Sequence, residues 1–207
     1  MICEKLYRKI FDPISYLSLL KKQINEGTLL NLGCGEGGPI VNLKLKNYRV
    51  GLDAFELYIR QAKEKDTHDE YILADIRYLP FKPKSFNTVL CIDVIEHLEK
   101  YEGYALLKTM EDMAKRKVII FTPNGFLPQD EYDSNLLQVH KTGWTVNELK
   151  KLGYKCIGVS GLKYLRAHEA QLKFNEGILK YLNLLISDIS EIIVLRSPKV
   201  AFQILCA

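Results

Sequence analysis

A glycine-rich stretch near the N-terminus carries the residue types best suited to bind a ligand. It reads NLGCGEGG over residues 31–38 and fits both G-x-G-x-x-G and G-x-G-x-G. Glycines let the backbone approach a ligand closely and adopt positive φ angles. Asp53 follows Gly33 by about 20 residues, where a carboxylate can accept hydrogen bonds from both hydroxyls of a ribose. The pair predicts a nucleoside site, with a tight turn and an ordinary helix cap as the alternative.

Two further carboxylates follow apolar runs directly, Asp75 after YILA and Asp93 after VLCI. Ligands of open α/β sheets bind outside the carboxyl ends of the strands. We therefore expect Asp53, Asp75 and Asp93 on one edge of a sheet, none of them paired with a cation nearby in the sequence. Such an edge favours a ligand with an adenosine and a positive charge. It predicts S-adenosylmethionine rather than a dinucleotide, unless the second and third acids only cap loops.

Short apolar runs must position these residues. Five of them are rich in Leu, Ile and Val and nearly continuous, as in strands buried on both faces of a parallel sheet; they are residues 28–33, 48–53, 70–75, 87–92 and 117–122. Helical patterns lie between them, over 39–46, 57–65 and 99–114, and the first opens at Pro39. This alternation predicts a Rossmann-like, doubly wound α/β fold with helices on both faces of the sheet.

The pattern changes after residue 123. Residues 123–143 are rich in Pro, Gly and Asn without periodicity, and a loop of this length is usually functional or mobile. A helix over 145–152, a strand over 154–160 and a last strand over 199–207 are expected. Residues 168–195 carry a wide apolar stripe, which is typical of a helix packed on the core. A lid, a dimer surface or a lipid-facing patch would give the same stripe.

Length and composition indicate one globular domain. The chain has 207 residues, of which 47% are apolar and 26% charged. We divide it into an N-terminal helical cap (1–27), a cofactor-binding core (28–160), a helical insertion (161–198) and a final strand (199–207). The net charge of +4 is spread along the chain, so nucleic acid is not an expected partner. A homodimer is compatible with this composition.

The cysteines and the apolar runs bear on location. The five cysteines are widely spaced and form no C-x-x-C pair, so we expect reduced, mostly buried thiols in the cytoplasm. No run approaches the roughly 18 uninterrupted apolar residues of a membrane-spanning helix. The charged N-terminus does not resemble a secretion signal.

Several motifs together resemble those of class I S-adenosylmethionine-dependent methyltransferases. They are LLNLGCGEGG, GLDAF and LADIRYLPFKPKSFNTVLCIDVIEHL, and they are most similar to the type 11, ubiquinone/menaquinone-methyltransferase-like subgroup. The resemblance spans about residues 28–123, and the strands YKCIGVS and KVAFQILCA agree with it in order. It implies a seven-stranded sheet whose last strand is antiparallel, with the cofactor over the glycine turn.

The resemblance also implies roles for single residues. Gly33 and Gly35 would line the methionine end of the cofactor, and Asp53 would bind its ribose. Asp75 would receive the adenine amino group, and Asp93 would lie near the methionine moiety. The other cofactor contacts that we expect are Asn31, Cys34, Ala54 (or Phe55) and Ile76. The family usually has Asp or Glu where this chain has Asn31, which accepts hydrogen bonds but brings no charge.

Catalysis by methyl transfer makes modest demands on side chains. The reaction is an in-line displacement, so alignment can supply much of the acceleration. A general base is needed only if the acceptor must lose a proton. His140, in the long loop, and His97, after the fourth strand, are the candidate bases; each could instead be structural or a surface residue. Glu131, Tyr132, Asp133 and Trp144 share the loop and could shape the acceptor pocket, and no metal ligands are expected.

The same residues allow other functions. Asp93 is not followed by Pro-Pro, and Cys91 lacks a preceding Pro, so nucleobase acceptors are disfavoured and a small-molecule or lipid-like acceptor is expected. An NAD-dependent reductase would also use the glycine turn, but its Y-x-x-x-K pair, Tyr104 and Lys108, comes too early in the chain. A non-catalytic adenosine- or S-adenosylmethionine-binding module remains the main alternative, which cofactor turnover would exclude.

Overall fold

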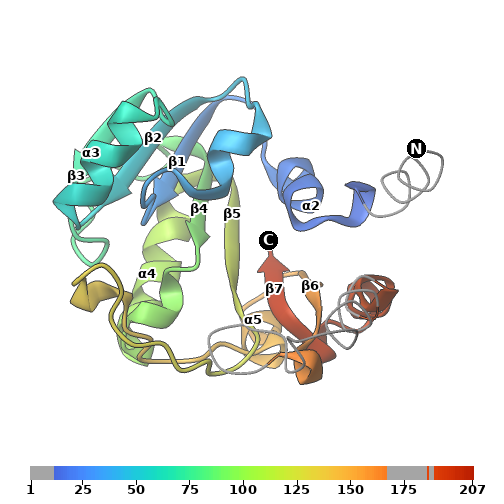
Figure 1. The fold of residues 1–207 in the computed structure, drawn as a ribbon. Coiled ribbons are helices and arrows are strands. Elements are labelled where there is room, and N and C mark those ends of the chain that lie inside the picture. The colour runs from blue at the N-terminus through green and yellow to red at the C-terminus, as the bar shows by residue number, and fades with distance from the viewer. Residues whose placement is uncertain (1–11, 167–185, 187–188) are drawn as a thin grey trace.

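A seven-stranded sheet forms the centre of the computed structural model, which describes residues 12–166, 186 and 189–207 (Figure 1). The strands lie in the order β3-β2-β1-β4-β5-β7-β6. β1 to β5 run parallel, and β7 is antiparallel to both β5 and β6. Their bounds are β1 Thr28–Leu32, β2 Tyr48–Asp53, β3 Glu70–Leu73, β4 Phe86–Ile92, β5 Ala114–Pro123, β6 Cys156–Leu162 and β7 Ala201–Cys206. The predicted doubly wound fold with an antiparallel last strand is confirmed.

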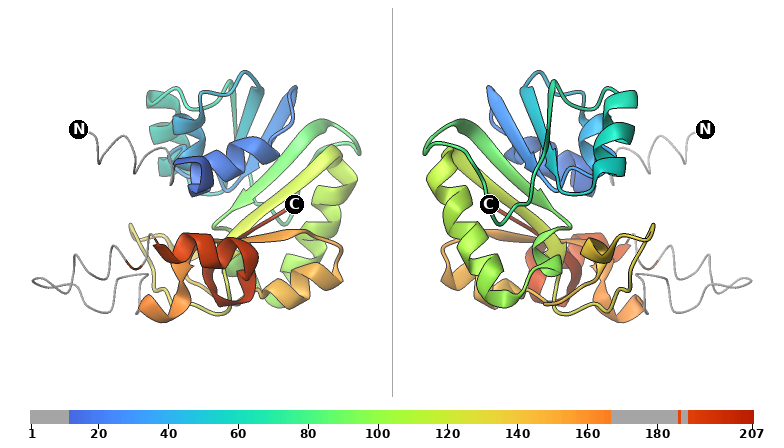
Figure 2. Two further views of the ribbon diagram at one scale, coloured as in Figure 1. Left: turned by 90° about the vertical axis from the view of Figure 1, so that its right-hand side faces the viewer. Right: turned by 90° about the vertical axis from the view of Figure 1, so that its left-hand side faces the viewer.

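Helices cover both faces of the sheet, as the two side views show (Figure 2). α4 (Lys100–Met113) and α5 (Val146–Lys151) contribute to the core on one face. α2 (Tyr16–Gln23) and the 3-10 helix η2 (Gly38–Leu43) pack on the other. α3 (Glu56–Glu64) connects β2 to β3. Both faces of the central strands are therefore buried, which explains their nearly continuous apolar sequences.

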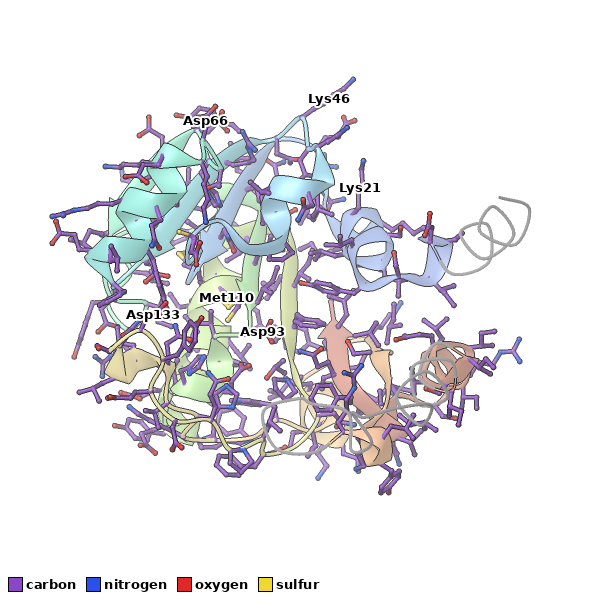
Figure 3. All side chains as sticks on the ribbon, in the orientation of Figure 1. Lys21, Lys46, Asp66, Asp93, Met110 and Asp133 are labelled. Carbon is purple, nitrogen blue, oxygen red and sulfur yellow. A yellow bond between two sulfur atoms is a disulfide. The ribbon has the colours of Figure 1, made fainter. Side chains whose placement is uncertain are left out.

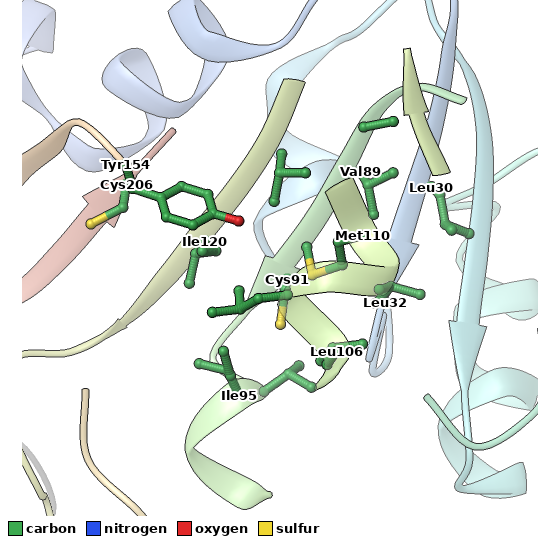
Figure 4. Close-up of a cluster of buried hydrophobic side chains, with 14 of the residues drawn as sticks. Leu30, Leu32, Val89, Cys91, Ile95, Leu106, Met110, Ile120, Tyr154 and Cys206 are labelled. Carbon is green, nitrogen blue, oxygen red and sulfur yellow. The ribbon is translucent and has the colours of Figure 1, made fainter. Parts of the chain in front are cut away.

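The larger of the two cores lies between the sheet and α4 (Figure 4). Leu30, Leu32, Val89 and Cys91 from the strands meet Met110 from α4, and all are 0% exposed. This close packing fixes the carboxyl ends of β1 and β4 relative to each other. The loops that leave those ends therefore start from rigid positions.

The helix expected over 39–46 is wrong in type and length, because the structure has only the short η2 there. Left-handed residues lie at both of its ends: Gly37 has φ 112° and Lys44 has φ 45°. Neither conformation continues an α-helix. The other expected helices correspond to α3, α4 and α5, while most of the apolar stripe over 168–195 lies outside the described residues.

The expectation that all five cysteines are reduced is also corrected. Cys156 and Cys206 form a disulfide between β6 and β7, whereas Cys34 and Cys91 are free and buried. The two disulfide cysteines are 50 residues apart in sequence, but the antiparallel register places them directly opposite each other, with their Cα atoms 4.1 Å apart. Only the strand pairing brings them together, so sequence spacing did not reveal the pair. Cys3 lies outside the described residues.

The described part of the chain contains no helix that is both long and apolar enough to cross a membrane. At the C-terminal side, residues 189–196 are helical and bury Ser190 and Val194. Ile189, Ile192 and Ile193 on the same helix are about half exposed. The division of the chain into cap, core, insertion and final strand stays a prediction.

Candidate functional site

A cavity of about 570 Å³ opens at the carboxyl ends of β1, β2 and β4. The loops that follow these strands supply much of its wall. Every residue predicted to contact a cofactor lines it: Asn31, Gly33, Cys34, Gly35, Asp53, Ala54, Asp75, Ile76 and Asp93. Phe55, the alternative to Ala54, instead packs against the ring of Tyr58, with 4.9 Å between ring centroids. The structure therefore brings residues from four separate segments to one site.

The glycine turn leaves β1 with a backbone that only glycine adopts easily. Gly33 and Gly35 have φ angles of 65° and 52°. A Cβ on Gly33 would come within 2.3 Å of the Val94 side chain, whereas a Cβ on Gly35 would meet nothing within 4 Å. Gly33 is therefore required for packing against the β4 loop. Gly35 presents bare backbone to the cavity, as expected for a turn over which a ligand lies.

Asp53 ends β2 and ties the second loop to the glycine turn. Its two carboxylate oxygens accept hydrogen bonds from the backbone N–H groups of Gly35 and Phe55, both at 2.9 Å. Burial raises the pKa of Asp53, and these hydrogen bonds oppose the rise. Each oxygen keeps a second lone pair, so the carboxylate can still accept two hydroxyl donors from a ligand.

Asp75 was expected to have no cationic partner nearby in the sequence, but the structure pairs it with Arg77, two residues away. The Arg77 guanidinium contacts both carboxylate oxygens, at 2.5 Å for the shortest N–O pair, and the Arg77 backbone N–H donates to Oδ1 at 2.9 Å. These hydrogen bonds lower the pKa of Asp75. The backbone turns tightly at Ile76 and Arg77, and the sequence alone did not indicate this turn. Arg77 also pairs with Glu102 at 3.3 Å.

Asp93 lies at the end of β4, near the centre of the molecule (Figure 3). It has a φ angle of 49°, and Gln203 of β7 donates a hydrogen bond to its carboxylate at 3.4 Å. Asp93 lines the cavity and keeps an exposed surface there. Desolvation by the surrounding protein raises the pKa of its carboxyl to about 7, and the Gln203 hydrogen bond opposes the rise.

The candidate bases lie in different positions relative to the cavity. His97 lines it, but His140 does not and is only 9% exposed. Each ring uses Nδ1 toward a backbone carbonyl, His97 toward Val139 at 3.2 Å and His140 toward Leu127 at 2.6 Å. Burial lowers the pKa of both histidines, that of His97 to about 4 with a further contribution from His140. The lowered pKa values favour the neutral ring in both, with Nδ1 protonated and Nε2 as the acceptor.

Glu96 completes a polar cluster beside these histidines. It is 1% exposed; one carboxylate oxygen accepts from the Thr122 hydroxyl at 3.0 Å, and the other has no hydrogen-bond partner among the described residues. Burial raises its pKa. One ligand atom each from Glu96, His97 and His140 lies within 4.8 Å of the others, so this group could hold a metal ion. The sequence did not predict such a group, because Glu96 and His140 come from separate loops.

The long loop after β5 closes the cavity opposite the glycine turn. Its wall here consists of Tyr132, Asn135, Leu137, Gln138 and Lys141. The Tyr58 hydroxyl of α3 donates to Asp133 at 3.2 Å, which holds the loop against α3. The expectation that Trp144 shapes an acceptor pocket is wrong. Its side chain is 0% exposed, and its indole N–H donates to the Ile95 carbonyl at 3.4 Å in the core.

Sequence reasoning missed several residues of the cavity wall. Tyr58 belongs to α3, Lys65 directly follows that helix, and Arg77 and Leu98 follow β3 and β4. Arg77 could have been predicted, because it lies two residues after Asp75 and the loops after parallel strands share one edge of the sheet. The sequence around Tyr58 and Lys65 gives no such signal.

The shape and chemistry of the cavity fit an S-adenosylmethionine molecule. The bare backbone at Gly35 leaves room that a Cβ would fill, and the Asp53 carboxylate stands beside it. The carboxylates of Asp53 and Asp93 can attract a cationic ligand, whereas that of Asp75 is already paired with Arg77. Apolar side chains, among them Ile76 and Leu98, line the same space.

Known proteins resemble this chain in sequence. Residues 30–122 match a family described as a methyltransferase domain, of type 11. An uncharacterized protein of Methanocaldococcus jannaschii, MJ0638, is 27% identical over 75% of this chain and 67% of its own length. A ubiquinone biosynthesis O-methyltransferase of Rickettsia bellii is 29% identical over 49% of this chain and 44% of its own length. The chain thus covers less than half of the second relative.

Solved structures share the fold. A SAM dependent methyltransferase from Archaeoglobus fulgidus aligns with 98% of this chain and 97% of its own length, with a TM-score of 0.56 and 16% identity. Residues 30–122, less than half of the chain, thus match a type 11 methyltransferase domain in sequence, and the chain shares its fold with the solved methyltransferase.

Proposed function

We propose that the cavity binds S-adenosylmethionine and that the protein transfers its methyl group to a small-molecule or lipid-like acceptor. The observation that carries this proposal is the convergence of the glycine turn, Asp53, Asp75 and Asp93 on one cavity. An open space of about 570 Å³ is large enough for a cofactor and part of a small acceptor. The relative named for ubiquinone biosynthesis supports a lipid-like acceptor.

In this proposal, Asp53 accepts hydrogen bonds from the ribose hydroxyls while its backbone contacts hold the glycine turn in place. Ala54 and Ile76 contact the adenine ring, and Asp75 receives its amino group, sharing its oxygens with Arg77. Gly33, Cys34 and Gly35 bound the methionine end. Burial raises the pKa of the Cys34 thiol to about 12, so it remains protonated and serves as an apolar wall.

The acceptor side is formed by the loop after β5 and by His97. Bound cofactor supplies an activated methyl group, and the residues of this side must align the acceptor with it. Asp93 stabilises positive charge beside the reacting atoms when it is ionised. His97 is neutral and lines the cavity, so its Nε2 can accept a proton from an acceptor hydroxyl or amine. His140 packs against His97 and orients it.

The remaining expectations belong to the same proposal. We infer a single domain that acts in the cytoplasm, and nucleic acid is not an expected partner. A homodimer would cover the half-exposed Ile189, Ile192 and Ile193. The disulfide between Cys156 and Cys206 is unusual for a cytoplasmic protein, and its presence in purified protein would count against that location.

A transfer assay tests the proposed function. Purified protein is incubated with S-adenosylmethionine that is radiolabelled in the methyl group and with fractionated polar and lipid extracts. The proposal expects label in a small or lipid fraction, and the variant Gly35→Val, which fills the cradle, should abolish it. Binding of S-adenosylhomocysteine without label transfer to any fraction would favour the non-catalytic binding module.

A further inference from the structure

A buried hydrogen-bond chain behind the glycine turn links α3 to the cavity wall. It runs from the Ala62 carbonyl through Thr67 and His68 to Asn31. Thr67, His68 and Asn31 are 0%, 1% and 3% exposed. The proposed function gives no role to Ala62, Thr67 or His68. Asn31, at the other end of the hydrogen-bond chain, lines the cavity.

The chain fixes the tautomer of His68. The Thr67 hydroxyl donates to the Ala62 carbonyl at 3.3 Å, so its oxygen is left to accept. His68 Nδ1 lies 2.7 Å from that oxygen, and in this arrangement Nδ1 carries the ring proton and donates it to the hydroxyl. Nε2 of the neutral ring is then a lone-pair acceptor. Burial keeps the ring neutral by lowering the pKa of His68 to about 4; nearby Arg49 adds to this effect and Asp69 opposes it.

The tautomer in turn fixes the Asn31 amide. Only its NH2 group can donate to His68 Nε2, and the two nitrogens are 3.2 Å apart. Its carbonyl oxygen must then point away from His68, and within the described residues no donor bonds to that oxygen. We propose that His68 is a positioning residue, which holds the Asn31 oxygen toward the cavity to receive the cofactor's ammonium group. This inference rests on the proposed function.

The packing around His68 supports a site shaped for this ring. A Cβ on Gly51 of β2 would come within 2.9 Å of the imidazole, so the strand carries the residue that makes room for it. The Tyr71 hydroxyl accepts from the His68 backbone N–H at 2.9 Å and donates to Ala62 at 3.0 Å. The ring thus has one defined orientation.

The arrangement explains why asparagine stands at position 31. A carboxylate there would put an oxygen lone pair against the lone pair of Nε2, unless His68 changed tautomer, which would turn the Thr67 hydroxyl away from Ala62, or took up a proton in a buried site. Asparagine supplies the NH2 donor for His68 and an oxygen for the ligand at once. The neutral pair of Asn31 and His68 therefore replaces an acidic residue as the acceptor for the ammonium group.

Two ligands separate this role from a general effect on the fold. S-adenosylhomocysteine has the ammonium group, whereas 5′-methylthioadenosine has the same nucleoside without the amino-acid part. Calorimetry should show that His68→Phe weakens S-adenosylhomocysteine about five- to tenfold and 5′-methylthioadenosine less than twofold. The matched control Tyr71→Phe alters the same cluster but keeps the Asn31 contact, and should leave the ratio unchanged. His68→Gln, which offers an acceptor oxygen, should restore most of the affinity.

Equal losses for both ligands in His68→Phe, or none, would overturn the proposal. A second measurement needs no variant: long-range 15N–1H NMR of the wild-type full chain should show His68 protonated at Nδ1 and bare at Nε2. The opposite tautomer would overturn the proposal even if His68→Phe fails to fold. Failure of the wild type to bind either nucleoside would instead reject the proposed function.

Discussion

The imidazole rings of His97 and His140 lie 4.7 Å apart between centroids, at an interplanar angle of 66°, and only the first of the two lines the cavity. Both rings direct Nδ1 toward backbone carbonyls of the long loop. Residues from the β4 loop and from the loop after β5 are thus held in one polar cluster. Because only His97 lines the cavity, we expect it to act as the base and His140 to orient it.

His97→Ala should reduce turnover more than His140→Ala. A group that accepts the acceptor's proton contributes about 10² to 10⁴ to the rate, so we expect a loss in that range for His97. Loss of His140 should reduce turnover only about five- to tenfold by loosening His97. Steady-state assays on both variants, with S-adenosylhomocysteine affinity as the control for the fold, check this prediction.

Two results would contradict this assignment. A larger loss in His140→Ala would return the base to His140. A loss of wild-type activity on chelation that Zn²⁺ restores would mean that Glu96, His97 and His140 hold a metal ion instead.

Ionisation of Asp93 should make cofactor binding depend on pH. Its pKa is raised to about 7, mainly by burial, so the carboxyl is neutral below and charged above that value. A charged carboxylate attracts the sulfonium of S-adenosylmethionine but not the neutral thioether of S-adenosylhomocysteine. The preference for S-adenosylmethionine should therefore increase at least threefold between pH 6 and pH 8.

The control for this measurement is Asp93→Asn, in which the ratio of the two dissociation constants should stay flat with pH. The ligands share their amino-acid group, so its titration cancels in the ratio. A slope that persists in Asp93→Asn would assign the effect to another group.

The ion pair of Asp75 and Arg77 makes a separable prediction for adenine binding. Asp75→Ala should weaken S-adenosylhomocysteine about five- to tenfold by removing an acceptor for the adenine amino group. Arg77→Ala frees the carboxylate and should leave affinity within about twofold of wild type. Calorimetry on both variants tests this. An unchanged affinity in Asp75→Ala would mean that the Asp75–Arg77 pair only stabilises the turn and does not bind adenine.

The disulfide between Cys156 and Cys206 should add to stability. It closes a segment with a sequence separation of 50, and a bridge of that kind contributes about 2 to 4 kcal/mol to the free energy of unfolding. Urea unfolding with and without reductant measures the difference, and Cys156→Ser should match the reduced protein. Thiol titration of the denatured protein should count two fewer thiols without reductant; five reactive thiols would show that the bridge does not form.

The strands could be predicted from sequence because burial on both faces leaves a nearly continuous apolar run. β2 matches its predicted range, 48–53, while β6 is shifted by two residues, to Cys156–Leu162. The cofactor residues were predictable for a related reason. Parallel strands end at one edge, so polar residues directly after them meet there.

The rest of the site depends on contacts that sequence order does not encode. His68 and Asn31 are 37 residues apart and meet only because β1 and the start of β3 flank β2. The loop that brings His140 next to His97 has no periodic pattern from which its path could be predicted. His140 is buried and does not line the cavity, which the sequence did not indicate. Asp75 and Arg77 are close in sequence, but their side chains form an ion pair only because the backbone between them turns.

The measurement that tests the central claim most directly is calorimetric titration of the full chain with S-adenosylhomocysteine and with NAD. We predict one bound S-adenosylhomocysteine per chain and no detectable binding of NAD. Asp53→Ala, which loses a carboxylate acceptor for the ribose hydroxyls, should reduce that affinity at least tenfold while the protein stays folded. Preferential binding of NAD, or an unchanged dissociation constant in Asp53→Ala, would contradict the account.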